Sequence, residues 1–272
     1  MGKKRFFDDR LKYLSFIQNT SEKRAISEQL APHIASMEQN RTFLRVLDAG
    51  TGDGTVKSNV IKTFHKYHPY TSLLITGKEI SYEDLKNTLE KMPDRFVEHP
   101  NLLVTMTNVK FAELGHIESS NKIKGKNVKS YTLVLKDDNS FDFHAQINKL
   151  NSFIKKNWGI EIDNKSRTSY ANPCIIRIYR EDHKRYIEPF IDNDYKNNNY
   201  DLIIASQAYR AASEVRTKVN NVIAPLMRLL NKSGKLLVTH SCGGDTVEKI
   251  LKVAWKDKNP FPNKAKDIID FL

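Results

Sequence analysis

An acidic residue followed by closely spaced glycines is the feature of this chain best suited to chemistry. The apolar run Phe43–Leu47 ends in Asp48. The loop that follows at once consists of Gly50, Thr51, Gly52, Asp53 and Gly54. Glycine accepts positive φ and lets a ligand approach the backbone without a Cβ in the way. The spacing G-x-G-x-G differs from the dinucleotide fingerprint G-x-G-x-x-G and from the P-loop pattern. The loop therefore predicts either a site for a nucleotide-like cofactor or a purely structural turn.

A second acidic residue ends the next apolar run. Glu79 follows Leu73–Lys78 and stands 25 positions after Gly54. An acid at the end of the second strand of an open α/β sheet accepts hydrogen bonds from ribose hydroxyls. Ser81 with Asp84 has the pattern of a capping box, so the alternative is a surface carboxylate near a helix start. Because the spacing is in register with the glycine loop, we expect the ribose role.

Secondary structure must hold these residues at one edge of a sheet. Three further strands are predicted over Leu102–Thr107, Tyr200–Ser206 and Leu236–His240. Apolar residues at helical spacing predict helices after the first two strands and before the fifth, the last one closed by Gly234. The inner faces of the first two helices carry Val56, Val60, Ile61 and Phe64, and Leu85, Leu89 and Met92. This order predicts an α/β fold with a doubly wound, mostly parallel sheet.

The two acid-containing segments resemble motifs of class I S-adenosylmethionine (SAM) dependent methyltransferases. In that family the acid at the end of the first strand and the glycines cradle the methionine and ribose part of SAM. The usual second motif is G-x-[DE]-x-S, which Gly77, Glu79 and Ser81 reproduce. The segment around Gly234 is similar to the family's L-x-x-G-G-x-L region, with Ser233 in place of the first glycine.

The resemblance covers residues 43–109 and 200–241 and implies a Rossmann-like methyltransferase fold. It implies SAM as cofactor and S-adenosylhomocysteine as product, and it indicates no subfamily. The family usually places an acid or amide against adenine after the third strand, where Asn108 stands. The cofactor-binding residues that the resemblance implies are Asp48, Gly50, Thr51, Gly52, Asp53, Gly54, Glu79, Ile80, Asn108 and Ser206.

Residues after the fourth and fifth strands would face the transferred methyl group. Amino-group methyltransferases of nucleobases and glutamine carry [DNS]-P-P-[YFW] after the fourth strand, and this chain keeps Ser206 and Tyr209 but lacks both prolines. N-methylation of adenine or glutamine is therefore not favoured. We predict Tyr209 and His240 as catalytic residues, the first stacking on the acceptor and the second taking its proton. A structural role is the alternative for each. No metal site is predicted, because no metal-ligand cluster is evident.

The 272 residues are predicted to form one methyltransferase domain with two additions. Residues 1–42 should form a helical arm, which either covers the cofactor or only packs on the sheet. Roughly 90 residues separate the third and fourth strands, too many for a simple connection in this fold. We predict that this large insertion, residues 110–198, is a substrate-binding cap; a role in stability or dimerisation is the alternative.

The insertion has a secondary structure of its own. Strands are predicted over Ser130–Leu135 and Cys174–Tyr179, and one helix over Phe143–Trp158. After His240 the sequence predicts a helix and a short final helix, but not the antiparallel hairpin usual in the family. Either the chain is cut short there or strands of the insertion complete the edge of the sheet.

Composition limits the remaining possibilities. The net charge of +12 is compatible with a nucleic-acid partner. The insertion, however, contains 16 basic and 12 acidic residues, a small excess that favours a solvated surface. The densest basic stretch consists of Lys122, Lys124, Lys126 and Lys129. No apolar run is long enough to span a membrane. Cys174 and Cys242 form neither a zinc motif nor a disulfide framework, which indicates a reducing cytoplasm.

We therefore expect a cytoplasmic SAM-dependent methyltransferase whose acceptor is a small molecule or a protein side chain. One alternative is an RNA methyltransferase that uses the lysine stretch. Another, from a different class, is a catalytically silent SAM-fold binding module or partner subunit. A nucleotide-dependent oxidoreductase is disfavoured by the glycine spacing. The oligomeric state stays open.

Overall fold

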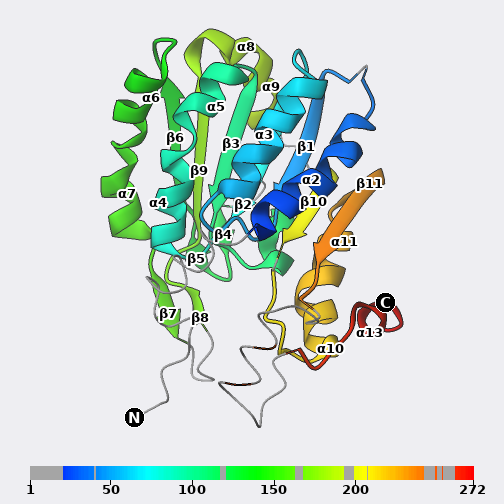
Figure 1. Ribbon diagram of the computed structural model, residues 1–272. Helices are drawn as coiled ribbons and strands as arrows, with labels where there is room; N and C mark the ends of the chain where they lie inside the picture. The colour runs from blue at the N-terminus through cyan, green and yellow to red at the C-terminus, as the bar shows by residue number, and fades with distance from the viewer. Residues whose placement is uncertain are drawn as a thin grey trace.

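The computed structural model of the protein describes residues 21–39, 41–116, 121–162, 168–192, 199–206, 208–241, 249, 253 and 261–272. The strands of the central sheet are β1 (Phe43–Asp48), β2 (Ser72–Lys78), β3 (Leu102–Thr107), β6 (Lys129–Leu135), β9 (Cys174–Arg180), β10 (Tyr200–Ser206) and β11 (Leu230–Thr239). Their order is β11-β10-β1-β2-β3-β9-β6 (Figure 1). The first five run parallel, β9 runs antiparallel to β3, and β6 runs parallel to β9. The predicted α/β fold and mostly parallel sheet are confirmed, and the architecture is compatible with a Rossmann-like fold.

Helices cover both faces of this sheet. One face carries α2 (Glu22–Ala35), α3 (Thr55–Tyr67), α4 (Tyr82–Glu90), α5 (Pro93–Glu98), α6 (Ser140–Ile147) and α7 (Leu150–Asn157). The other carries η2 (Phe111–His116), η3 (Glu181–His183), α8 (Lys184–Ile187), α9 (Pro189–Asp192), α10 (Val215–Lys218), η4 (Val219–Ile223) and α11 (Ala224–Met227). Successive strand residues point to opposite faces, so Val46 joins the core under the first set and Leu47 the core under the second.

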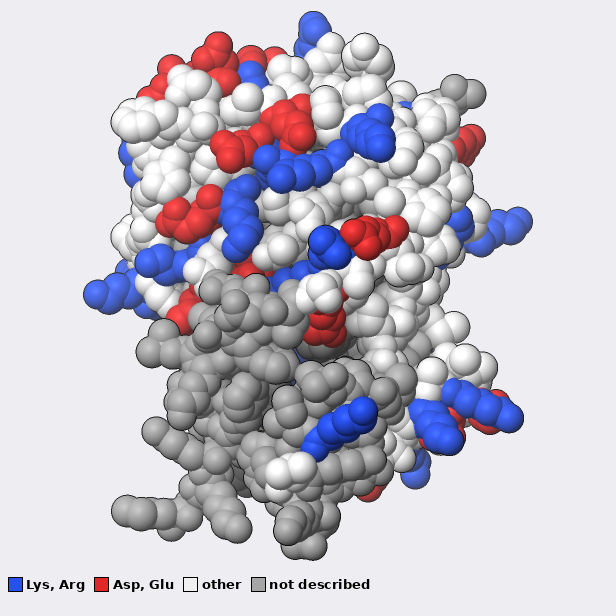
Figure 2. Space-filling model, viewed as in Figure 1, with Lys and Arg blue, Asp and Glu red and all other residues white. Residues whose placement is uncertain are grey.

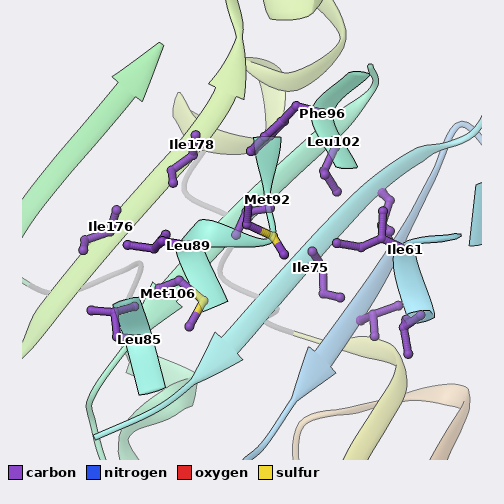
Figure 3. Packing of buried hydrophobic residues seen from close by; sticks show 14 of the residues in the cluster. Ile61, Ile75, Leu85, Leu89, Met92, Phe96, Leu102, Met106, Ile176 and Ile178 are labelled. Carbon is purple, nitrogen blue, oxygen red and sulfur yellow. The ribbon is translucent and has the colours of Figure 1, made fainter. Parts of the chain in front are cut away.

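The larger core fixes α4 against the end of β2 (Figure 3). Leu85, Leu89 and Met92, predicted as one helical face, are all buried. Burial of each such side chain contributes about 1.5–3 kcal/mol. α4 ends before Pro93, which opens α5. This packing holds the turn that carries Glu79 in one place.

Part of the insertion extends the central sheet. The predicted strands are present as β6 and β9, and β9 pairs with β3, so strands of the insertion complete that edge of the sheet. Two short ribbons, β4 (Lys122–Ile123) with β5 (Lys126–Asn127) and β7 (Ile160–Ile162) with β8 (Thr168–Tyr170), lie at the end towards which the parallel strands point (Figure 1).

The single helix predicted over residues 143–158 is wrong, because the chain forms α6 and α7 with a break at Asn148 and Lys149. The side chain of Asn148 bonds to His144 and to Asn151. Such local side-chain bonds compete with the regular helix ladder. Ile147, Leu150 and Ile154 are nevertheless buried, so both helices turn an apolar face towards the core.

The predicted helix end at Gly234 is also wrong. The helix ends at Met227 with α11, and Gly234 lies inside β11. The pairing of β11 with β10 changes register between Tyr200 and Leu202. A Cβ at Gly234 would lie only 2.5 Å from the carbonyl oxygen of Tyr200. This glycine therefore permits close approach of two strands rather than capping a helix.

The ends of the chain agree with the sequence where they are described. α2 follows Ser21 and contains Pro32, although the Ser21 side chain makes no capping hydrogen bond. The rest of the predicted arm, residues 1–20, and the helix expected after His240 lie outside the described residues. The short final helix is α13 (Ala265–Ile269). Within the described residues, no helix has the length and apolarity needed to cross a membrane.

Candidate functional site

The glycine loop lies where the parallel strands end, between β1 and α3. Gly52 and Gly54 have φ of +54° and +77°, a backbone region that strongly favours glycine. A Cβ on Gly54 would lie 2.7 Å from the Cα of Thr88 in α4. A Cβ on Gly50 would lie 3.1 Å from the carbonyl oxygen of Ser206 at the end of β10. The loop is thus held tightly between α4 and β10.

Glu79 joins the two motifs that the sequence singled out. One carboxylate oxygen accepts a hydrogen bond from the Gly52 N–H at 2.8 Å. The other accepts from the N–H groups of Ile80 and Ser81 at 2.7 and 2.8 Å. Burial raises the pKa of Glu79, although Lys78 opposes the shift. The predicted pair of cofactor motifs is therefore adjacent in space, and the predicted cap is present because Ser81 Oγ accepts from the next helix.

Asp48 is a buried carboxylate whose oxygens make no close hydrogen bond to the described residues, although the Thr51 hydroxyl and the Gly50 N–H are near enough to lower its pKa. Its exposed fraction is 1 %. Burial raises the pKa of Asp48 to about 6, and the ammonium of Lys57 opposes this shift. An unpartnered buried carboxylate is costly, so this group is well suited to receive a donor from a ligand.

Lys57 is a site residue that the sequence reasoning missed. It is 0 % exposed, and its Nζ donates to the sulfur of Met106 at 3.1 Å. Burial lowers the pKa of Lys57 to about 8, and Asp48 opposes the shift. A Cβ on Gly77 would collide with this Nζ, so a larger residue there would displace the Lys57 ammonium. The sequence could have indicated that Lys57 is buried. Lys57 stands four residues before Ile61, which places both on the inner face of the helix.

Two other predicted cofactor residues, Asp53 and Thr51, make contacts within the protein. Asp53 accepts from the first turn of α3 and forms an ion pair with Lys23 of α2 at 2.6 Å. Burial alone would raise the pKa of Asp53, but the hydrogen bonds from Lys23 and the Thr55 N–H and the charges of Lys23 and Lys91 together outweigh burial, and the pKa is lowered. Thr51 is buried, and its hydroxyl donates to the carbonyl oxygen of Asp48 at 3.3 Å. These contacts fix the conformation of the glycine loop.

Asn108 ties the insertion to the end of β3. Its amide nitrogen donates to the carbonyl oxygen of Asn172 at 2.9 Å, and its amide oxygen accepts from the Cys174 N–H at 2.8 Å. Asn108 therefore holds the start of β9, and its predicted contact with adenine stays a prediction. Cys174 is a free, buried cysteine, and burial raises the pKa of its thiol to about 12.

Tyr209 and His240, the two predicted catalytic residues, are brought together. Their ring centroids lie 5.9 Å apart. The hydroxyl of Tyr209 and Nδ1 of His240 are buried and have no hydrogen-bond partner among the described residues. His240 Nε2 contacts the carbonyl oxygen of Asn263 at 3.0 Å. Since a carbonyl only accepts, Nε2 carries the proton and Nδ1 has the free lone pair.

Two of the four lysines of the basic stretch are paired with carboxylates. Lys124 pairs with Glu113 at 2.8 Å, and Lys126 pairs with Glu161 at 2.8 Å. On the face shown in Figure 2, Lys and Arg are interspersed with Asp and Glu. These two pairs reduce the positive charge that the stretch presents. Among the described residues, no group of three or more His, Cys, Asp or Glu could hold a metal ion.

This chain matches no known family model and no curated protein. The proposed function therefore rests on the arrangement of the side chains at the site.

Proposed function

We propose that this protein is a class I SAM-dependent methyltransferase. The observation that carries the proposal is the bond of Glu79 to the Gly52 N–H, at 2.8 Å, beside the unpartnered carboxylate of Asp48. Together they form an acidic, glycine-lined edge where the parallel strands end. Such edges are where open α/β sheets bind nucleotide-like ligands. The mostly parallel sheet with helices on both faces supports the same proposal.

The residues present suit the cofactor. In the proposal, the Asp48 oxygens would accept from the ammonium group of the methionine part, and Glu79 would accept from the ribose hydroxyls. Gly50 allows the loop to approach the carbonyl oxygen of Ser206 closely. Ser206 ends β10, and Asn108 follows the end of β3. When bound, SAM would supply an electrophilic methyl group on a sulfonium.

The acceptor would bind beside Tyr209 and His240. The free Nδ1 of His240 can take a proton, and Tyr209 offers a ring face and an unpartnered hydroxyl. In the proposal, the parts of residues 110–198 that lie at this end of the sheet form the substrate-binding cap. An RNA acceptor is less well supported, because two lysines of the stretch are paired with carboxylates.

Calorimetry of the full chain with S-adenosylhomocysteine and with NAD tests the proposal. We expect saturable binding of S-adenosylhomocysteine and none of NAD, since the loop has the wrong glycine spacing for a dinucleotide. Binding of NAD alone would overturn the proposal. A catalytically silent binding subunit would bind S-adenosylhomocysteine but transfer no methyl group from labelled SAM to any acceptor in a broad panel.

A further inference from the structure

A buried lysine lies beneath the two predicted acceptor residues. Lys218, at the end of α10, is 0 % exposed. Its Nζ donates to the carbonyl oxygen of Ala211 at 2.7 Å and to the side-chain oxygen of Asn263 at 2.8 Å. The same Nζ lies 5.4 Å from the centre of the Tyr209 ring. Like Lys57, Lys218 could have been found from helical register, because it precedes Val222 by four residues.

Among the described residues, this ammonium has only neutral partners. Two amide oxygens and one aromatic ring surround it, and burial is the cause that lowers the pKa of Lys218, with no carboxylate acting on it among the described residues. A buried cation without a counter-ion is costly. Charge interactions are also stronger away from water. A negative charge placed beside Tyr209 would therefore be stabilised.

Asn263 links the cation to the predicted base. Its side chain accepts from Lys218, and its backbone carbonyl accepts from His240 Nε2. The link leaves Nδ1 of His240 without a proton and next to the Tyr209 ring. A cation, a proton acceptor and an unpartnered hydroxyl thus meet at the ends of β10 and β11.

We infer that Tyr209, Lys218 and His240 form a site for an acidic oxygen of the acceptor, a phenol or a carboxylic acid, which binds and reacts as its anion. The inference rests on the proposed function. The proton of the acceptor passes to His240 Nδ1. The acceptor oxygen then forms a bond to the methyl carbon while the carbon–sulfur bond breaks, and that electron pair stays on sulfur. Lys218 is a positioning residue that holds the anion by charge and holds His240 through Asn263.

The test uses 4-nitrophenol, whose anion is coloured, with the full chain saturated with S-adenosylhomocysteine. We expect the midpoint of deprotonation of the bound phenol to fall by about one pH unit, since a nearby opposite charge favours the anion. Lys218→Met should abolish the shift. Lys155→Met, on an exposed lysine of α7, should preserve it. If Lys218→Met does not fold, competition on the wild-type chain replaces it, and benzoate should displace the phenol at lower concentration than benzylamine.

Each other outcome is decisive. An unshifted midpoint, no binding of 4-nitrophenol, equal behaviour of Lys218→Met and wild type, or better displacement by benzylamine would overturn the anionic acceptor. These results would leave the proposed function standing as long as S-adenosylhomocysteine binds. Failure to bind S-adenosylhomocysteine would overturn the proposed function instead.

Discussion

His99 should make the stability of this fold sensitive to acid. The side chain is fully buried, and Nε2 contacts the carbonyl oxygen of Thr71 at 3.1 Å. Because a carbonyl only accepts, Nε2 carries the proton and Nδ1 must accept from His65 Nδ1, which lies 3.2 Å away. Burial lowers the pKa of His99 to about 4, and the charges of His65 and His183 add to this effect.

The size of the effect follows from the two pKa values. The unfolded chain takes up a proton at His99 near the ordinary pKa of 6.5, whereas the folded chain does so only near 4. Between these values protons favour the unfolded state. This contribution to stability is therefore fully present above pH 6.5 and is lost as the pH falls towards 4. The difference in pKa corresponds to about 3 kcal/mol in the free energy of unfolding.

Comparison with a variant isolates this contribution. Asp48 acts in the opposite direction over a similar range, because burial raises its pKa to about 6 and the folded state takes up that proton first. Urea unfolding at about pH 7, 5.5 and 4.5 should therefore be compared between wild type and His99→Gln, with the wild type losing up to about 3 kcal/mol more. His144→Gln, on an exposed histidine, is the control. Equal pH dependence of wild type and His99→Gln would show that buried His99 does not cause the loss of stability in acid.

Two further predictions concern the glycine loop and the acceptor side. Gly54→Ala should destabilise the fold more than Gly125→Ala in urea unfolding, because both glycines have φ of +77° but only the first new Cβ would collide with Thr88; equal losses would show that the loop relaxes. His240→Ala should lower the rate by about 10²–10⁴ and remove a limb of the pH–rate profile near neutrality, whereas Tyr209→Phe should leave the profile alone. An unchanged profile for His240→Ala would mean that the site acts by positioning only.

The strands beneath the glycine loop were predictable because they are buried on both faces. β1 and β3 are almost continuously buried, so a plain apolar run marks each of them. The pairing of the insertion was not predictable. Most of β6 is half-buried or exposed, and nothing local specifies that β9 runs antiparallel to β3. That pairing depends on tertiary contacts such as the Asn108 bond to the start of β9.

The candidate site was predictable in its outline but not in its buried charges. Tyr209 and His240 follow adjacent parallel strands, so their contact could be expected from strand order alone. Lys57 and Lys218 were missed because lysine is ordinarily a surface residue. Helical register places both on inner faces, and only the structure shows that their ammonium groups are fully buried.

Binding of S-adenosylhomocysteine to wild type and to Glu79→Ala is the most direct test of whether Glu79 and the glycine loop bind SAM. Calorimetric titration should show that Glu79→Ala weakens binding by about 1–3 kcal/mol, because it removes a charged hydrogen-bond acceptor. Glu28→Ala is the matched control, since Glu28 is exposed and forms an ion pair with Arg24 of the same helix. Thermal unfolding without ligand should accompany each titration, because Glu79 also holds the Gly52 N–H. Full affinity in a folded Glu79→Ala variant, or no binding to the wild type, would show that Glu79 and the glycine loop do not bind SAM.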